Sequence, residues 1–195
     1  GRYDAQQTVR DYAALLGREG RNLGRLIDNL LAYARMSDVR QAYTFEPLDV
    51  SDLVDGALER FRTLLAEQRF SVDVQVPPDL PPVRADRQAA LQALDNVIDN
   101  AIKYSERTRV VQIQARVVDR SVAIGVADRG IGIPGGELAR VSDKFFRGRA
   151  ATRGGSGLGL AIVREIVEAH GGRLHIESRP GQGTRVEIRL PQAAS

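Results

Sequence analysis

Asn96, Asn100 and Lys103 recur at helical spacing in the middle of the chain. A helix turns by about 100° per residue, so this spacing gathers the three side chains on one face, nearly opposite an apolar face. Amide oxygens suit hard cations such as Mg²⁺, which proteins hold through few side chains plus phosphates, and a lysine supplies a counter-charge for phosphate. The pattern predicts a face that binds a metal and phosphates. A solvated polar face is the alternative.

A carboxylate followed at once by glycines forms a second candidate site. The apolar run 122–127 predicts a strand that ends at Asp128, and Gly130 and Gly132 follow. A carboxylate there can accept a hydrogen bond from an exocyclic amine such as that of adenine, and glycines let the backbone pass close to a flat ring. Residues 130–135 also match the G-x-G-x-x-G dinucleotide fingerprint. We reject that fold, because Pro134 interrupts the expected helix and the flanking strands are predicted to be antiparallel.

A third glycine-rich run, residues 153–159, precedes an apolar helix predicted from about Leu158 to His170. Free backbone N–H groups and the helix dipole attract phosphate at such a start. The run lacks Gly-Lys-Ser/Thr, so it is not a P-loop. A flexible structural loop is the alternative.

Between the glycine runs lies the segment 141–149, which carries Phe145, Phe146 and several cations, among them Lys144 and Arg147. Aromatic and cationic side chains in one irregular segment could form a lid over a polyphosphate. A charged surface loop is the alternative.

Composition removes several other classes of function. The 195 residues are 43% hydrophobic and 27% charged, which excludes a disordered chain or a fibre. The chain has no Cys, which excludes disulfide scaffolds, thiolate zinc sites and Cys nucleophiles. Its cations are spread along the chain, so the net charge of +3 does not predict nucleic-acid binding. No segment approaches the roughly 20 apolar residues that cross a bilayer.

Elements that would position these residues follow from hydrophobic periodicity. We expect an α+β fold: a two-layer sandwich whose mixed, mostly antiparallel sheet carries helices on one face. The expected helices are 51–68, capped by Ser51 or Asp52, then 86–104, capped by Asp86, and 158–170. The expected strands are 70–76, 110–118, 121–127, 173–178 and 184–190. Residues 37–50, 77–82 and 128–157 are expected to be a connector, a proline-rich loop and an irregular stretch.

Residues 8–36 predict a separate long, coiled-coil-like helix. Its apolar residues alternate spacings of four and three, as in a heptad seam: Val9, Ala13, Leu16, Gly20, Leu23, Ile27, Leu30 and Ala34. This narrow stripe favours one helix of an intermolecular bundle over a terminal helix packed on its own domain.

The chain has two histidines, His170 and His175. His170 precedes Gly171 at the end of a predicted helix, where a cation is favoured. His175 alternates with apolar residues on a predicted strand and faces the same side as Glu177. We expect both to have structural or surface roles.

In this order, the motifs resemble the catalytic, ATP-binding domain of bacterial sensor histidine kinases, which has the Bergerat (GHKL) fold. Residues 96–104 resemble the N box, 128–132 the G1 box, 144–147 the F box, 155–160 the G2 box and 181–184 the last glycine motif. The resemblance covers about 44–191. It implies a catalytic domain at 44–195, preceded at 1–43 by a linker and the second helix of the dimerisation and phosphotransfer hairpin.

The resemblance also implies ligands and roles. Asn100 would coordinate Mg²⁺, Asp128 would bind the adenine amine, and Lys103, Tyr104 and Arg147 would approach the phosphates. The implied ATP-binding set is Asn96, Asn100, Lys103, Tyr104, Asp128, Gly130, Gly132, Ile133, Phe146, Arg147, Gly155, Ser156, Gly157, Leu158, Gly159, Leu160 and Thr184.

One contrast with related enzymes and two departures from the family pattern sharpen this expectation. Related ATP hydrolases carry a Glu as general base where this chain has Asn96, which favours a phosphoryl donor over an efficient ATPase. Ser142 stands where the F box usually opens with an aromatic residue. The acceptor motif, a His followed by an acidic residue, is absent. The simplest explanation is that the acceptor helix lies upstream of a fragment; a naturally degenerate kinase is less favoured.

We therefore expect an ATP-dependent protein histidine kinase domain, inactive in autophosphorylation as this chain. It would transfer the γ-phosphoryl group to an upstream histidine for relay to the receiver domain of a response regulator. The full protein would form a homodimer through its N-terminal helix, and this part of it would be cytoplasmic and not membrane-embedded. The alternatives are a nucleotide-binding interaction module and a non-transferring GHKL ATPase.

Overall fold

The computed structural model describes residues 43–105, 108–148 and 156–193, together with Thr8, Val9, Tyr12, Ala13, Leu16, Gly17, Gly20 and Gly24. The chain divides into two compact units, residues 1–41 and 42–195. In the first unit, all eight described residues are helical. They include the first four seam positions, from Val9 to Gly20; the other four lie outside the described residues.

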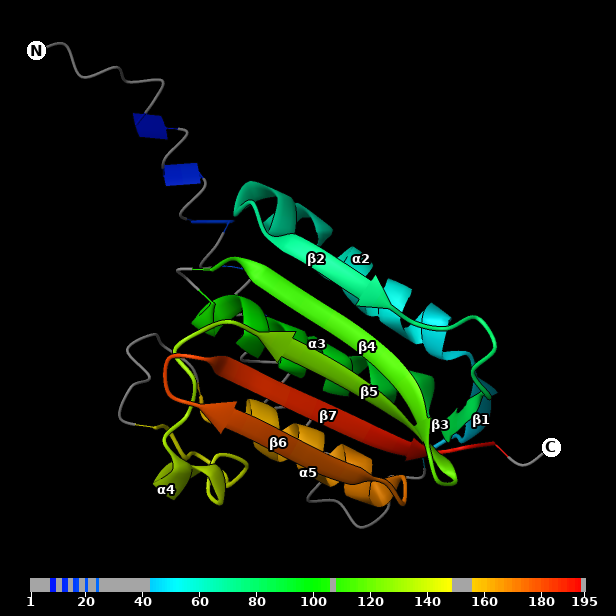
Figure 1. Ribbon diagram of the computed structural model, residues 1–195. Helices are drawn as coiled ribbons and strands as arrows, with labels where there is room; N and C mark the ends of the chain where they lie inside the picture. The colour runs from blue at the N-terminus through cyan, green and yellow to red at the C-terminus, as the bar shows by residue number, and fades with distance from the viewer. Residues whose placement is uncertain are drawn as a thin grey trace, which may run out of the picture. The chain divides into compact units, whose positions relative to one another are not determined.

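The second unit contains a five-stranded sheet (Figure 1). Its strand order is β2-β4-β5-β7-β6, and only the β2–β4 pairing is parallel. The strands are β2 (Ser71–Gln75), β4 (Val110–Val118), β5 (Ser121–Asp128), β6 (Arg173–Arg179) and β7 (Gly183–Pro191). The predicted mixed, mostly antiparallel sheet is therefore confirmed.

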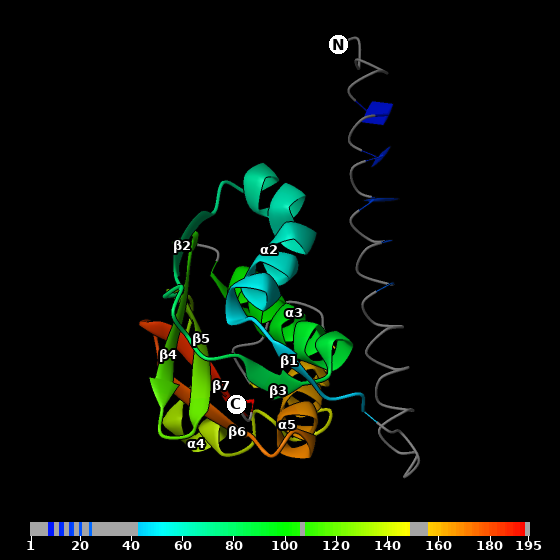
Figure 2. The same cartoon turned by 90° about the vertical axis from the view of Figure 1, so that its right-hand side faces the viewer.

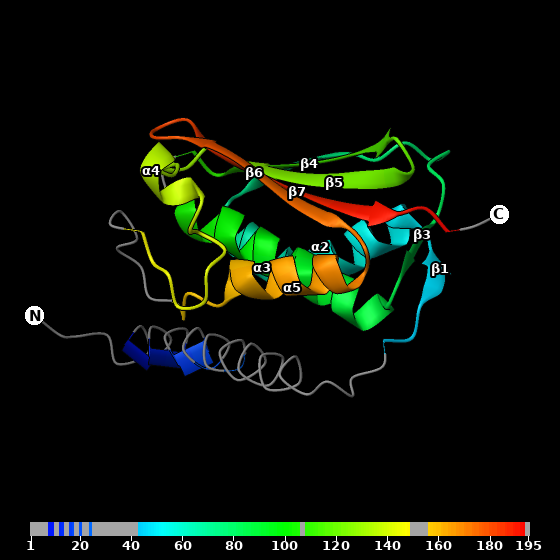
Figure 3. The same ribbon diagram turned by 90° about the horizontal axis from the view of Figure 1, so that it is seen from below.

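Three helices cover one face of this sheet (Figures 2 and 3). They are α2 (Val50–Glu67), α3 (Arg87–Tyr104) and α5 (Gly159–Ala169). The core lies between the layers, where Ile98 of α3 and Ile162 of α5 are 1% exposed, as are Ile113 and Ile124 of the sheet. This arrangement confirms the two-layer sandwich.

Helix starts follow local chemistry in one case and tertiary packing in another. Asp86 caps α3, because its Oδ1 accepts a hydrogen bond from the Ala89 backbone N–H at 2.9 Å, as predicted. The predicted cap of α2 was wrong: the N-cap residue is Asp49, and its side chain makes no capping bond. Here the buried residues Val50 and Leu53, 2% and 0% exposed, set the start by packing.

Sequence patterns missed a second, two-stranded sheet and a short helix. β1 (Glu46–Leu48), which lies in the expected connector, pairs antiparallel with β3 (Val83–Ala85), a segment for which no element was predicted. Three-residue strands are too short to show a period of two, so this pairing has no sequence signature. Helix α4 (Gly135–Leu138) lies in the stretch that was expected to be irregular. Among the described residues, no helix has the length and apolar character that a bilayer crossing requires.

Candidate nucleotide-binding site

The polar face of α3 meets the start of α5. A Cβ atom placed on Gly159 would lie 3.3 Å from Oδ1 of Asn96 and 3.7 Å from Nδ2 of Asn100. Asn96 is further oriented because its Nδ2 donates to the Gln92 carbonyl at 2.9 Å. The two amides are therefore packed against a helix N-terminus, which a purely solvated polar face would not be. Lys103 lies near them on the same helix, with its Nζ 5.0 Å from the centre of the Tyr104 ring.

Asp128 ends β5 and is held by two backbone N–H groups. Gly130 and Thr184 donate to its Oδ1 at 2.7 and 3.2 Å. Burial raises the pKa of the Asp128 carboxyl above its ordinary value, and the two hydrogen bonds oppose that rise. No described residue donates a hydrogen bond to Oδ2. The fixed carboxylate thus keeps one oxygen for an amine donor of a ligand.

Glycines around Asp128 are required by close backbone approach. A Cβ atom on Gly130 would lie 2.0 Å from the Tyr104 carbonyl oxygen, and one on Gly183 would lie 2.0 Å from the Asp128 carbonyl oxygen. Gly183 also has φ +96°, a conformation that side chains disfavour. These contacts join the end of α3, the end of β5 and the start of β7 at one place.

Ser178 links the same region through its hydroxyl. Its Oγ accepts from the Ile133 backbone N–H at 2.8 Å, donates to the Gly183 carbonyl at 2.8 Å, and lies 2.9 Å from Oγ1 of Thr184. The predicted residues Ile133 and Thr184 are thereby brought together. Sequence analysis missed Ser178, because a serine on an alternating strand carries no distinguishing signal.

The N-terminus of α5 has the properties of a phosphate site. Its N-cap residue, Leu158, is 3% exposed and provides no capping side chain, while the Leu158 backbone N–H bonds Oγ of Ser156 at 3.3 Å. Gly157 has φ +70° and accepts a hydrogen bond from the Phe145 N–H at 3.0 Å. Backbone N–H groups without a capping side chain favour an anion. The predicted Gly155 lies outside the described residues.

The segment Ser142–Gly148, which we call the lid segment, follows α4. Phe146 packs under Arg140, whose Cζ lies 4.7 Å from the ring centre, whereas Phe145 is 64% exposed and has φ +63°. Arg147 is exposed. The predicted aromatic and cationic residues of the lid therefore play different parts, with Phe146 packed and Phe145 presented to solvent.

Binding of a metal ion at this site would require ligands from the nucleotide phosphates. The described residues contain no group of three or more His, Cys, Asp or Glu side chains that could hold an ion. Mg²⁺ commonly uses one or two protein oxygens and takes the rest from phosphates and water. The amides beside Gly159, at a helix start suited to phosphate, fit an ion that arrives with a polyphosphate.

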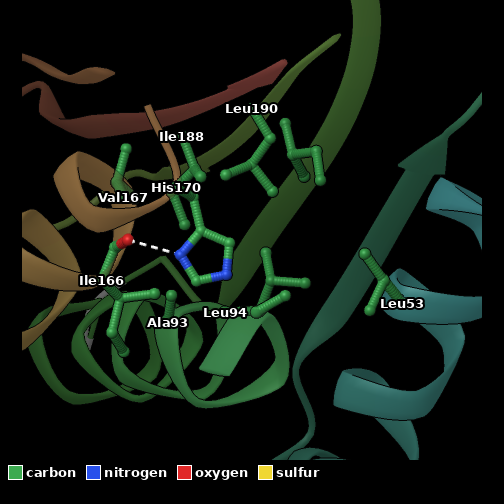
Figure 4. Close-up of a pocket in the computed structure, with 10 residues that line it drawn as sticks. Leu53, Ala93, Leu94, Ile166, Val167, His170, Ile188 and Leu190 are labelled. Carbon is green, nitrogen blue, oxygen red and sulfur yellow. Dashed lines mark hydrogen bonds between the residues drawn. The ribbon is translucent and has the colours of Figure 1, made fainter. Parts of the chain in front are cut away.

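Neither histidine lies among these residues. His170, 3% exposed, lies at the opposite end of α5 and lines a small apolar cavity in the core (Figure 4). Its Nε2 accepts from the Asp86 N–H at 3.0 Å and its Nδ1 donates to the Ile166 carbonyl at 2.7 Å. The expected structural role is confirmed, and burial lowers the pKa of the His170 imidazole. His175 is on the strand face shared with Glu177, 3.1 Å away.

Comparison with known proteins decides the family. Residues 85–194 match the family of histidine kinase-, DNA gyrase B-, and HSP90-like ATPases. A solved structure of the mycobacterial sensor histidine kinase MprB is 32% identical, with a TM-score of 0.66, and the match covers 78% of this chain and 100% of the chain in that structure. This chain belongs to the sensor histidine kinases. Its residues 85–194 form the ATPase domain of that family.

Other sensor histidine kinases match nearly the whole chain. The sensor-like histidine kinase SenX3 of Mycobacterium tuberculosis is 34% identical over 96% of this chain and 46% of its own length. The alginate biosynthesis sensor protein KinB of Pseudomonas aeruginosa is 33% identical over 97% of this chain and 32% of its own. Full-length ShkA, solved in complex with AMPPNP, is 28% identical with a TM-score of 0.79, over 100% of this chain and 41% of ShkA. The chain thus spans less than half the length of these three relatives.

Proposed function

We propose that this chain is the catalytic part of a longer histidine kinase, which transfers the γ-phosphoryl group of ATP to a histidine on an upstream helix. Residues 44–195 would form the catalytic domain, and residues 1–43 would form part of the dimerisation and phosphotransfer region. The phosphoryl group would then pass to an aspartate in the receiver domain of a response regulator, in the cytoplasm.

Asp128 would bind the exocyclic amine of adenine through Oδ2. Support comes from its two backbone hydrogen bonds, which use Oδ1 and fix the plane of the carboxylate. Gly130 lets the backbone pass close to the carbonyl of Tyr104, which leaves the neighbourhood of Asp128 without a bulky side chain at that position. The other members of the predicted ATP-binding set would line the rest of the site.

Mg²⁺ would be held by Asn100 together with the phosphates. When bound, it would neutralise charge on the β- and γ-phosphate oxygens. Lys103 and Arg147 would supply further positive charge, and the N-terminus of α5 would donate backbone N–H groups.

The environment of Asn96 is the observation that supports phosphoryl transfer rather than ATP hydrolysis. Its amide lies against Gly159, beside Asn100, and donates to the Gln92 carbonyl, so its orientation is fixed. An amide cannot take a proton from water, and efficient hydrolysis needs a group that activates or positions water. The arrangement thus favours transfer of the γ-phosphoryl group to a protein nucleophile over its hydrolysis by water.

The test uses γ-labelled ATP and the chain together with the polypeptide encoded upstream of Gly1. We expect acid-labile, alkali-stable phosphate on a histidine of the upstream polypeptide and none on His170 or His175. Transfer should be lost in Asn100→Ala and retained in Gln88→Ala, an exposed residue of the same helix. Intact ATP binding without any transfer would favour the alternative, a nucleotide-binding interaction module.

A further inference from the structure

Two adjacent residues of α5 face two adjacent residues of the lid segment with opposite charges. The Arg164 guanidinium lies 3.5 Å from the Asp143 carboxylate, and the Lys144 ammonium lies 2.6 Å from the Glu165 carboxylate. Arg164 also donates to Oγ of Ser142 at 3.1 Å. Each α5 residue therefore has a partner of complementary chemistry in the segment 142–144.

The same segment is also fixed through the backbone. The Phe145 N–H donates to the Gly157 carbonyl at 3.0 Å, and a Cβ atom on Gly157 would lie 2.8 Å from the Phe145 carbonyl carbon. The backbone at Phe145, the end of the segment 142–145, therefore contacts the backbone at Gly157, which lies just before α5. The side-chain pairs hold this meeting point against the helix.

We propose that Arg164 and Glu165 form a charge-paired clamp that positions the base of the lid segment for the polyphosphate of ATP. Ser142 stands where the F box usually has an aromatic residue, and here its hydroxyl accepts a hydrogen bond from the clamp. Arg164 and Glu165 act as positioning residues, because Gly159 places the start of their helix against Asn96 and Asn100. Arg147 follows Lys144 by three residues in the same segment.

The positioning role rests on the proposed function, whereas the clamp does not, so two measurements separate them. The first is hydrogen exchange at the Phe145 amide without nucleotide. We expect exchange about 1.5-fold to fivefold faster in Arg164→Ala and in Glu165→Lys, the range that partly exposed ion pairs give. The double variant Lys144→Glu with Glu165→Lys restores the charge pair and should restore protection. Unchanged exchange in the single variants, or no recovery in the double variant, would overturn the clamp.

The second measurement compares binding of ATP with binding of adenosine, which lacks phosphates. Arg164→Ala should weaken ATP binding about 1.5-fold to fivefold and leave adenosine binding unchanged. Arg164→Lys should retain part of the ATP affinity, because lysine can still donate to Ser142. The matched control is Arg62→Ala, which removes an exposed arginine paired with Glu59 on α2 and should affect neither ligand.

Equal weakening of ATP and adenosine binding by Arg164→Ala would assign Arg164 a general structural role and overturn positioning. Unchanged ATP affinity would do the same. A wild-type chain that binds no ATP would contradict the proposed function and positioning together, while the exchange experiment would still decide the clamp.

Discussion

The backbone N–H of Thr184 donates a hydrogen bond to Oδ1 of Asp128 at 3.2 Å, which joins the start of β7 to the end of β5 across 56 positions of sequence. The N–H of Gly130 reaches the same oxygen at 2.7 Å. The carboxylate is thus oriented by the backbone before any ligand arrives. A preorganised acceptor loses little conformational freedom on binding, which favours affinity and specificity.

Asp128→Asn should weaken binding of ATP and of adenosine about tenfold or more, because hydrogen bonds to charged groups are among the stronger ones. The variant replaces one acceptor oxygen with an NH₂ donor. That donor would face either the two backbone N–H groups or the adenine amine, and it cannot accept a hydrogen bond from any of them. Calorimetric titration with both ligands measures the change. Asp73→Asn, a polar change on β2, is the control and should bind as wild type does. Wild-type affinity in Asp128→Asn would reject the assigned pocket.

Gly130→Ala should lower the free energy of unfolding by about 2–4 kcal/mol, because the added Cβ would meet the Tyr104 carbonyl oxygen, which the backbone fixes. The matched control is Gly136→Ala in α4, where a Cβ meets no atom within 4 Å. We expect that control to stay within about 0.5 kcal/mol of wild type in urea denaturation. Similar effects of both substitutions would show that the close approach at Gly130 is not the constraint.

Asn100→Ala should remove most of the contribution of Mg²⁺ to ATP affinity. We expect the ratio of affinities with Mg²⁺ and with chelator to fall about tenfold, while affinity in chelator changes little. Gln88→Ala should keep the wild-type ratio. A wild-type ratio in Asn100→Ala would show that residues other than Asn100 bind the metal.

His170 should make stability depend on pH in the range where histidine titrates. Burial lowers its pKa below 6.5, while the Ile166 carbonyl and the Asp86 carboxylate oppose that shift and Arg84 adds to it. Below about pH 6.5 the unfolded chain therefore takes up a proton that the folded chain does not, so stability falls as pH falls toward the lowered pKa, by at most about 1.4 kcal/mol per pH unit.

Urea denaturation between pH 5 and 8 measures this dependence. His170→Gln should flatten it, at a cost in stability from the lost Asp86 bond. A wild-type pH dependence in His170→Gln would contradict a neutral, buried His170.

Sequence periodicity predicted the main sheet and its helices because their apolar faces are long enough to repeat. It could not predict β1 and β3, whose three residues each are held by pairing between positions 46–48 and 83–85. Spacing on α3 placed Asn96 and Asn100 on one face, but only the fold shows that Gly159 lies against them. Ser178 and Arg164 were missed because their importance comes from partners far away in sequence.

In the proposed complex, Asp128 and Asn100 bind the two ends of Mg-ATP. A crystal structure of the chain with Mg²⁺ and a non-hydrolysable ATP analogue tests it most directly. We predict the adenine amine within about 3 Å of Oδ2 of Asp128 and the metal about 2.1 Å from Oδ1 of Asn100. An adenine bound away from Asp128, or a metal held without Asn100, would contradict the account.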